Sequence, residues 1–143
     1  MNTAPLTRLL NPPELMAWNT DKRYLRALQA AGVACVPTQC VEPGDVPDTL
    51  VLPGSAGIAK PAVAGGAFGV RRFRGADDWG EGLAHVRRLA VHGAVLIQPY
   101  VAAVETAREL SLVFIDGQFS HAFRCSARWL NVNSAPARSR CGA

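Results

Sequence analysis

Lysine and long hydrophobic runs are both scarce in this chain of 143 residues. It holds two lysines, Lys22 and Lys60, against 13 arginines. Its longest apolar runs, such as Leu50–Pro53 and Leu110–Ile115, are too short to cross a bilayer, which excludes a transmembrane helix. The first residues lack the apolar stretch of a signal peptide. We therefore expect a cytoplasmic protein with no membrane partner.

Cysteine is sparse, and its spacing fits no metal site. The four cysteines form no CxxC pair, and no histidine stands at zinc-finger distance from them. We predict that Cys35 and Cys40 are small buried groups or free thiols in a reducing compartment.

Acidic residues are absent after Asp116, although the chain holds 11 of them. Residues 1–123 balance these with 11 basic side chains, so the net charge of +4 comes from the four arginines of the tail: Arg124, Arg128, Arg138 and Arg140. Four arginines in a tail are weak evidence for binding a polyanion, and no nucleic-acid-binding motif accompanies them. We therefore predict no nucleic-acid partner.

The composition that is present indicates a folded protein. Hydrophobic residues make up 49% of the chain and charged residues 18%, which excludes disorder as its main state. The length predicts one domain or two small ones.

Two N-terminal helices are predicted. Asn11-Pro12-Pro13-Glu14 forms a turn that opens the first, because proline is tolerated where the N–H has no helical partner. Asn19 or Thr20 is expected to cap the second, which ends at Gly32, a residue suited to the left-handed conformation.

A third helix is predicted after Asp77 and Asp78, which are expected to cap it. The apolar residues behind them keep near-helical spacing and are expected to form its buried stripe: Trp79, Leu83, Val86 and Leu89.

Strands are predicted on both sides of this helix. They are Val33–Val36, a strand that ends in Gly57–Pro61, Val70–Phe73 and Ala94–Gln98. Asp116-Gly117, between the apolar runs Glu109–Ile115 and Gln118–Phe123, is a strong hairpin signal. This order of elements predicts an α+β fold with antiparallel strands.

Lys60 stands in the most informative segment of the chain. It ends a predicted strand and precedes residues 62–69, a loop rich in glycine and alanine. A cation beside a loop of exposed backbone N–H groups suits a phosphate. The loop matches neither GxxxxGK[ST] nor GxGxxG, and a surface loop with a solvated lysine is the alternative interpretation.

Five motifs stand in order along residues 9–123. They are Asn19–Lys22, Ala31–Val33 leading to Pro37-Thr38, Ala59–Ala62 with the glycine loop, Ile97–Val101, and Glu109–Gly117. Together they resemble ATP-grasp enzymes, in the branch that contains bacterial glutathione synthetase, the ribosomal-protein-modifying glutamate ligases and the ligases of cycloserine-type biosynthesis.

The resemblance implies a partial ATP-grasp fold with an antiparallel sheet, a glycine-rich phosphate loop and a hinge β-hairpin. Intact members of the family join a carboxylate to an amine through an acyl-phosphate. The implied cofactors are ATP and Mg²⁺, and the implied partner is a small-molecule acid or amine substrate.

The resemblance also implies phosphate-binding residues. Lys22 and Lys60 match two cations on phosphate oxygens, while Gly65, Gly66 and Gly69 match the loop that folds over the phosphates. For Lys22 the alternative is an exposed lysine in a helical first turn.

The adenine and ribose sites are implied in the same way. Gln98, Pro99, Tyr100 and Val101 match a hinge whose main-chain groups pair with the adenine edge, and Glu109 matches an acidic position near the ribose or substrate. Core packing is the alternative role of Tyr100, and a solvated edge charge that of Glu109.

The chain departs from the family at both ends. Relatives carry an N-terminal domain ahead of the Asn-Pro-Pro turn, and they bind magnesium with acidic residues and an asparagine downstream of the hairpin. Asn131 and Asn133 cannot replace those carboxylates. A truncation or a change of reading frame near residue 124 accounts for the break, so we predict no metal ligand and no catalytic residue, and no ligase activity of this chain alone.

The expected organisation has four parts. Residues 1–55 are linker helices and a strand, 56–98 the phosphate-loop subdomain, 99–123 the hinge and the start of a second subdomain, and 124–143 an atypical basic tail. A non-catalytic truncated remnant and a basic-tailed interaction module remain alternative functions. Substrate and oligomeric state stay open.

The histidines and large aromatic residues receive structural roles. His121 is expected to be packed or solvent-facing, and His85 and His92 lack acidic neighbours that would suggest catalysis. Core positions are predicted for Trp18, Phe73 and Trp79.

Overall fold

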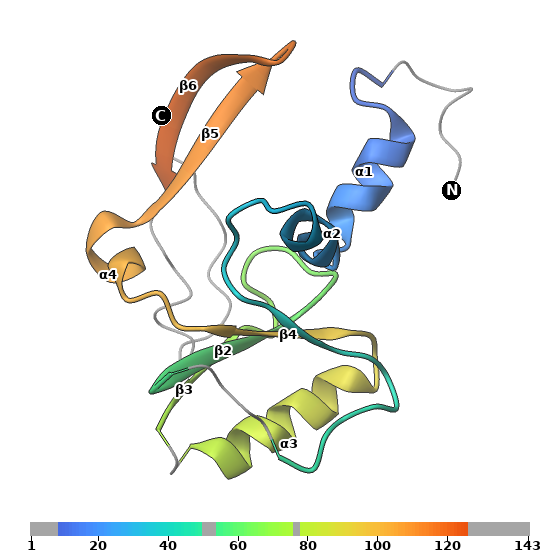
Figure 1. Ribbon diagram of the computed structural model, residues 1–143, viewed down its shortest axis with the longest axis vertical. Coiled ribbons are helices and arrows are strands. Elements are labelled where there is room, and N and C mark those ends of the chain that lie inside the picture. The colour runs from blue at the N-terminus through green and yellow to red at the C-terminus, as the bar shows by residue number, and fades with distance from the viewer. Residues whose placement is uncertain (1–8, 50–53, 76–77, 126–143) are drawn as a thin grey trace. The chain divides into compact units, whose positions relative to one another are not determined.

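The computed structural model describes residues 9–49, 54–75 and 78–125. Its elements are α1 (Pro13–Thr20), α2 (Tyr24–Ala30), β1 (Gln39–Val41), β2 (Ala56–Pro61), β3 (Arg71–Arg74), α3 (Trp79–Ala90), β4 (Val95–Pro99), α4 (Ala103–Ala107), β5 (Glu109–Ile115) and β6 (Gln118–Cys125) (Figure 1). The chain divides into two compact units, residues 1–99 and 100–143. All strand pairs are antiparallel, so the predicted α+β class is confirmed.

The N-terminal helices confirm two of the predicted signals. α1 begins at Pro13, as the proline turn predicts. After α2, Gly32 takes a φ of 78°, and its N–H donates to Gln29 O while the Val33 N–H donates to Leu28 O, both at 3.0 Å. This pair of bonds is a Schellman motif, which ends the helix at a residue with no Cβ penalty.

The predicted cap of the second helix is wrong. Asn19 and Thr20 belong to the last turn of α1, where the Thr20 hydroxyl donates to Met16 O at 2.8 Å. The turn before α2 is held instead by Asp21, whose carboxylate accepts the Arg23 N–H at 3.0 Å. Asx turns of this kind compete with side-chain caps for the same backbone donors.

The first unit contains a sheet of strand order β1-β4-β2-β3, with α3 over one face (Figure 1). The register pairs Ala59 with Ile97 across β2 and β4. The buried core between sheet and helix consists of Val41, Ala59, Phe73, Val86, Ala90, Val95 and Ile97, with Val46, Trp79, Leu83 and Leu89 packed against it. Each large aliphatic or aromatic side chain buried in this way contributes about 1.5–3 kcal/mol.

The predicted stripe of α3 is thereby confirmed, but the role given to Asp78 is not. Asp78 stands at the N-cap position without a side-chain cap bond, because its carboxylate accepts the Arg74 N–H at 2.9 Å. Asp77 lies outside the described residues.

Two other expectations are wrong. The strand predicted at Val33–Val36 lies instead at Gln39–Val41, where β4 offers a partner, and Val33 is 48% exposed. Trp18 is 47% exposed rather than part of the core, and its ring stacks on Tyr24 with centroids 4.7 Å apart.

The second unit contains α4 and the predicted hairpin of β5 and β6. Asp116 and Gly117 take φ values of 51° and 74°, the two left-handed residues of a type I′ turn. The register shifts between Val113 and Phe114, and the rings of Phe114 and Phe119 meet with centroids 5.8 Å apart. The short helix α4 had no signal in the sequence pattern.

Within the described ranges, no helix has both the length and the apolar character to cross a membrane.

Candidate functional site

Lys60 lies on the face of the sheet opposite α3. In an antiparallel pair, residues directly across from each other point to the same face, and successive residues alternate. Ala59 and its partner Ile97 face α3 in the core. The next pair, Lys60 and Leu96, therefore lies on the other face.

Arg72 shares this face, a point that the sequence analysis missed. The register pairs Ile58 with Arg72 on one side and with Gln98 on the other. Since Lys60 is two residues from Ile58, it is a diagonal neighbour of both, at a typical separation of about 7–8 Å. Two cations thus share the face of the sheet opposite α3, where Leu96 is also buried. The sequence of β3 alone does not show which of its side chains share a face with Lys60, because this depends on how β3 pairs with β2.

Lys22 is hydrogen-bonded to the start of the glycine-rich loop, residues 62–69. Its backbone N–H donates to Ala62 O at 2.9 Å, and its ammonium donates to Ala64 O at 2.6 Å and to Ala62 O at 3.4 Å. Lys22 is partly buried in the turn between α1 and α2, so the alternative of an exposed helical lysine is wrong. Instead it ties the loop to the N-terminal helices.

The loop contains the three predicted glycines and two internal turns. The Phe68 N–H donates to Gly65 O at 3.1 Å, and the Val70 N–H donates to Ala67 O at 3.2 Å. A Cβ added at Gly65 or Gly66 would meet no atom within 4 Å. The middle of the loop is therefore open to a ligand on the side where a Cβ would stand.

The far end of the loop is tightly packed at Gly69. Its φ is 69°, and a Cβ there would lie 2.9 Å from Pro61 Cγ and 3.2 Å from Leu89 Cδ2. Its carbonyl oxygen lies 2.9 Å from Nε2 of His85 on α3. Only glycine fits this position without displacing the end of β2 or the helix.

Gln98 has a structural side chain. It is 5% exposed, and its amide nitrogen donates to the Thr38 hydroxyl at 2.7 Å. Pro99 pairs with Gly57 at the end of β4. This arrangement fixes the last residues of β4 just before the chain enters the second unit.

The remaining predicted site residues belong to the second unit. The Tyr100 hydroxyl donates to the Glu105 carboxylate, and Val101 is 47% exposed. Glu109 is the first residue of β5 and is exposed.

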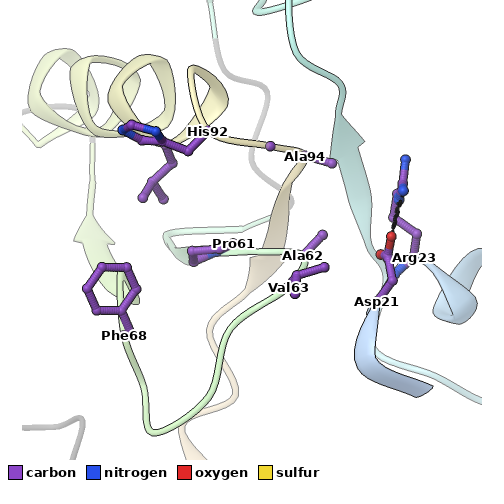
Figure 2. A pocket seen from close by; sticks show the side chains of 10 residues that line it. Asp21, Arg23, Pro61, Ala62, Val63, Phe68, His92 and Ala94 are labelled. Carbon is purple, nitrogen blue, oxygen red and sulfur yellow. Dashed lines mark hydrogen bonds and ion pairs between the residues drawn. The ribbon is translucent and has the colours of Figure 1, made fainter. Parts of the chain in front are cut away.

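An open pocket of about 470 Å³ lies beside the loop, and it contains none of the predicted nucleotide-binding residues. Figure 2 shows the Asp21–Arg23 ion pair on one side of it and Phe68 and His92 on the other. The pairing with Arg23 through a side-chain hydrogen bond lowers the pKa of Asp21. The pocket therefore adjoins the loop without including the face that carries Lys60.

A magnesium site is not built in the part of the chain that the structure describes. Residues 9–49, 54–75 and 78–125 bring together no group of three His, Cys, Asp or Glu side chains that could hold a metal ion. Asn131, Asn133 and most of the arginine-rich tail lie outside these ranges.

By comparison with solved structures, the chain has the fold of part of an ATP-grasp ligase. It is 37% identical over 131 residues to the cycloserine biosynthesis protein DcsG of Streptomyces lavendulae, which is 85% of this chain and 43% of that protein. The resemblance to ATP-grasp ligases is thereby confirmed for a partial fold. No protein-family model matches the chain.

Solved structures agree with this assignment. The crystal structure of D-cycloserine synthetase DcsG matches with a TM-score of 0.71 and 33% identity, over 83% of this chain and 42% of that one. D-Alanine-D-alanine ligase from Helicobacter pylori matches with a TM-score of 0.57 and 17% identity, over 80% of this chain and 37% of that one, which shows the fold alone. The chain spans less than half the length of these relatives.

Proposed function

We propose that the chain binds ATP, with the triphosphate between Lys60 and the glycine-rich loop. The observation that carries this proposal is the position of Lys60, on the face of the sheet opposite α3 and two residues before the loop begins at Ala62. Its ammonium offers charge-assisted hydrogen bonds to phosphate oxygens, and the glycines let backbone N–H groups approach them. Arg72, on the same face, adds a second cation.

We also propose roles for the other predicted residues. Lys22 holds the start of the loop and reaches a phosphate when the loop closes. Main-chain groups of Gln98–Val101 pair with the adenine edge, and Glu109 stands near the ribose or substrate. The proposed hinge would bind adenine through backbone groups. It is therefore compatible with the hydrogen bond that the Gln98 side chain donates to Thr38.

The proposed reaction of the whole ligase is the joining of a small-molecule carboxylate to an amine. ATP would transfer its terminal phosphoryl group to the carboxylate, and the amine would displace phosphate from the acyl-phosphate. Magnesium would neutralise charge during that transfer. The described residues offer no carboxylate cluster for it, so the role proposed for this chain is nucleotide binding. We also propose a cytoplasmic location, with which the unpaired Cys35 and Cys40 of the described residues are compatible.

The test is calorimetry with a non-hydrolysable ATP analogue. A charge-assisted phosphate contact contributes about 1.5–3 kcal/mol, so Lys60→Ala is expected to weaken binding about 10- to 100-fold. Lys60→Arg keeps the charge and should lose less.

Arg87→Ala is the matched control, because it removes one cation from the solvent side of α3, where Arg87 pairs only loosely with Asp48 at 3.8 Å. Equal affinities for Lys60→Ala and Arg87→Ala would refute the role of Lys60.

A further inference from the structure

His85 links α3 to the end of the glycine-rich loop. Its Nε2 lies 2.9 Å from Gly69 O, and its Nδ1 lies 3.3 Å from a terminal nitrogen of Arg88. His85 is partly buried, with its ring centroid 6.3 Å from that of Phe73 in the core. The imidazole therefore stands between the packed core and the loop.

These two contacts define the protonation state of the ring. A carbonyl oxygen can only accept a hydrogen bond, so Nε2 carries the proton towards Gly69. A guanidinium can only donate, so Nδ1 presents its lone pair to Arg88. Both contacts are satisfied together only by the neutral Nε2–H tautomer.

The surroundings oppose a charged ring. Burial lowers the pKa of His85 below its ordinary value of 6.5, and the positive charges of Arg88 and Arg71 lower it further, while the bond to Gly69 acts in the opposite direction. Arg88 contacts the ring from within α3. Arg71 lies on β3 and forms an ion pair with Glu81 of α3. These surroundings therefore favour the neutral form of His85.

We propose that His85 is a positioning residue for the glycine-rich loop: its neutral imidazole donates to Gly69 O and fixes the end of the loop against α3 and the end of β2. The consequence for nucleotide affinity rests on the proposed ATP site, whereas the effect on the loop does not. Lys22 holds the other end at Ala62 and Ala64. Gly65 and Gly66 thus lie between two fixed points, and losing either point should lengthen the part of the loop that no contact holds.

The test compares His85→Gln with His85→Leu in the 143-residue chain. The glutamine amide can donate to Gly69 O, whereas leucine cannot. Without nucleotide, loop amides from Gly65 to Val70 should exchange about 3- to 10-fold faster in His85→Leu and within about twofold of wild type in His85→Gln. Binding of the ATP analogue should fall by about the same factors.

His121→Leu serves as the control, because this histidine lies on the hairpin of the other unit and contacts Ser120. It should leave loop exchange unchanged.

A measurement on the wild-type chain covers the case in which His85→Leu fails to fold. Long-range ¹H–¹⁵N correlation should show His85 as the Nε2–H tautomer, titrating below 6.5, and Arg88→Met should raise its pKa.

An Nδ1–H tautomer, unchanged loop exchange in His85→Leu, or equal behaviour of the Gln and Leu variants would overturn the proposal. Absence of nucleotide binding by wild type would refute the ATP site instead, while loop exchange and tautomer would still decide the role of His85.

Discussion

At the scale of single residues, Lys22 combines a structural contact with a proposed functional one. Its ammonium is satisfied by carbonyl oxygens of Ala64 and Ala62. A phosphate must compete with these oxygens for the ammonium protons. A contact between Lys22 and a nucleotide would therefore replace hydrogen bonds that already exist. The net contribution of Lys22 to affinity should accordingly be smaller than that of a phosphate contact made without such competition.

Replacing Lys22 tests this view. Lys22→Met keeps much of the length and removes the donor, so loop amides at Gly65 and Gly66 should exchange faster, by about 3- to 10-fold for one lost hydrogen bond. Hydrogen–deuterium exchange by mass spectrometry measures it. Arg26→Met is the control, because Arg26 lies on α2 and pairs with Glu42 rather than with the loop. Equal exchange rates of the loop amides in both variants would contradict the conclusion that the Lys22 ammonium holds the loop.

Part of the candidate site could be predicted from single residues, and part could not. The scarcity of lysine and the glycines after Lys60 drew attention to the right segment. The carbonyl partners of Lys22 are 40 and 42 residues away, and His85 meets Gly69 only after α3 packs on the sheet. Such contacts leave no local pattern because they depend on the tertiary fold.

At the scale of elements, α3 approaches β3 closely at Gly82. A Cβ at Gly82 would lie 3.1 Å from Cδ1 of Phe73, a ring that is 1% exposed. The glycine lowers helix propensity but lets the helix approach β3. At Gly80, by contrast, an added Cβ would meet nothing within 4 Å.

This difference predicts opposite signs for two similar changes. Gly80→Ala should raise the free energy of unfolding by about 0.5–1 kcal/mol, the usual gain from replacing a helical glycine. Gly82→Ala should lower it, because overpacking a buried ring costs about 1–3 kcal/mol and exceeds that gain. Urea denaturation measures both. Stabilisation by Gly82→Ala would show that Phe73 can shift freely.

Local patterns predicted most elements with strong signals and missed those without them. The stripe of α3 and the Asp116-Gly117 hairpin follow from periodicity and turn chemistry. The strand β1 does not, because Gln39–Val41 has no alternating pattern and becomes a strand through pairing with β4. Val33–Val36 has the β-branched composition of a strand but no partner strand in the described part of the chain.

At the scale of the whole molecule, nucleotide binding and turnover should separate. We expect the 143-residue chain to bind the ATP analogue but to show no metal-dependent ADP release with a panel of amino acids. The described residues contain no metal cluster to neutralise charge during phosphoryl transfer. A coupled assay for ADP measures turnover, and analogue binding by the same preparation controls for folding. Robust, metal-dependent ADP release would show that magnesium is held in another way.

The strand order has a consequence for synthesis on the ribosome. β2 and β3 are neighbours in sequence and can pair as soon as both have left the exit tunnel. β1 pairs with β4, so it waits until residues 95–99 have been made, more than 50 residues later. Because β4 also pairs with β2, its arrival closes the sheet on both sides at once. While residues 95–99 are still inside the tunnel, β1 therefore has no partner strand, and the first unit can complete its sheet only after Pro99 has left the tunnel.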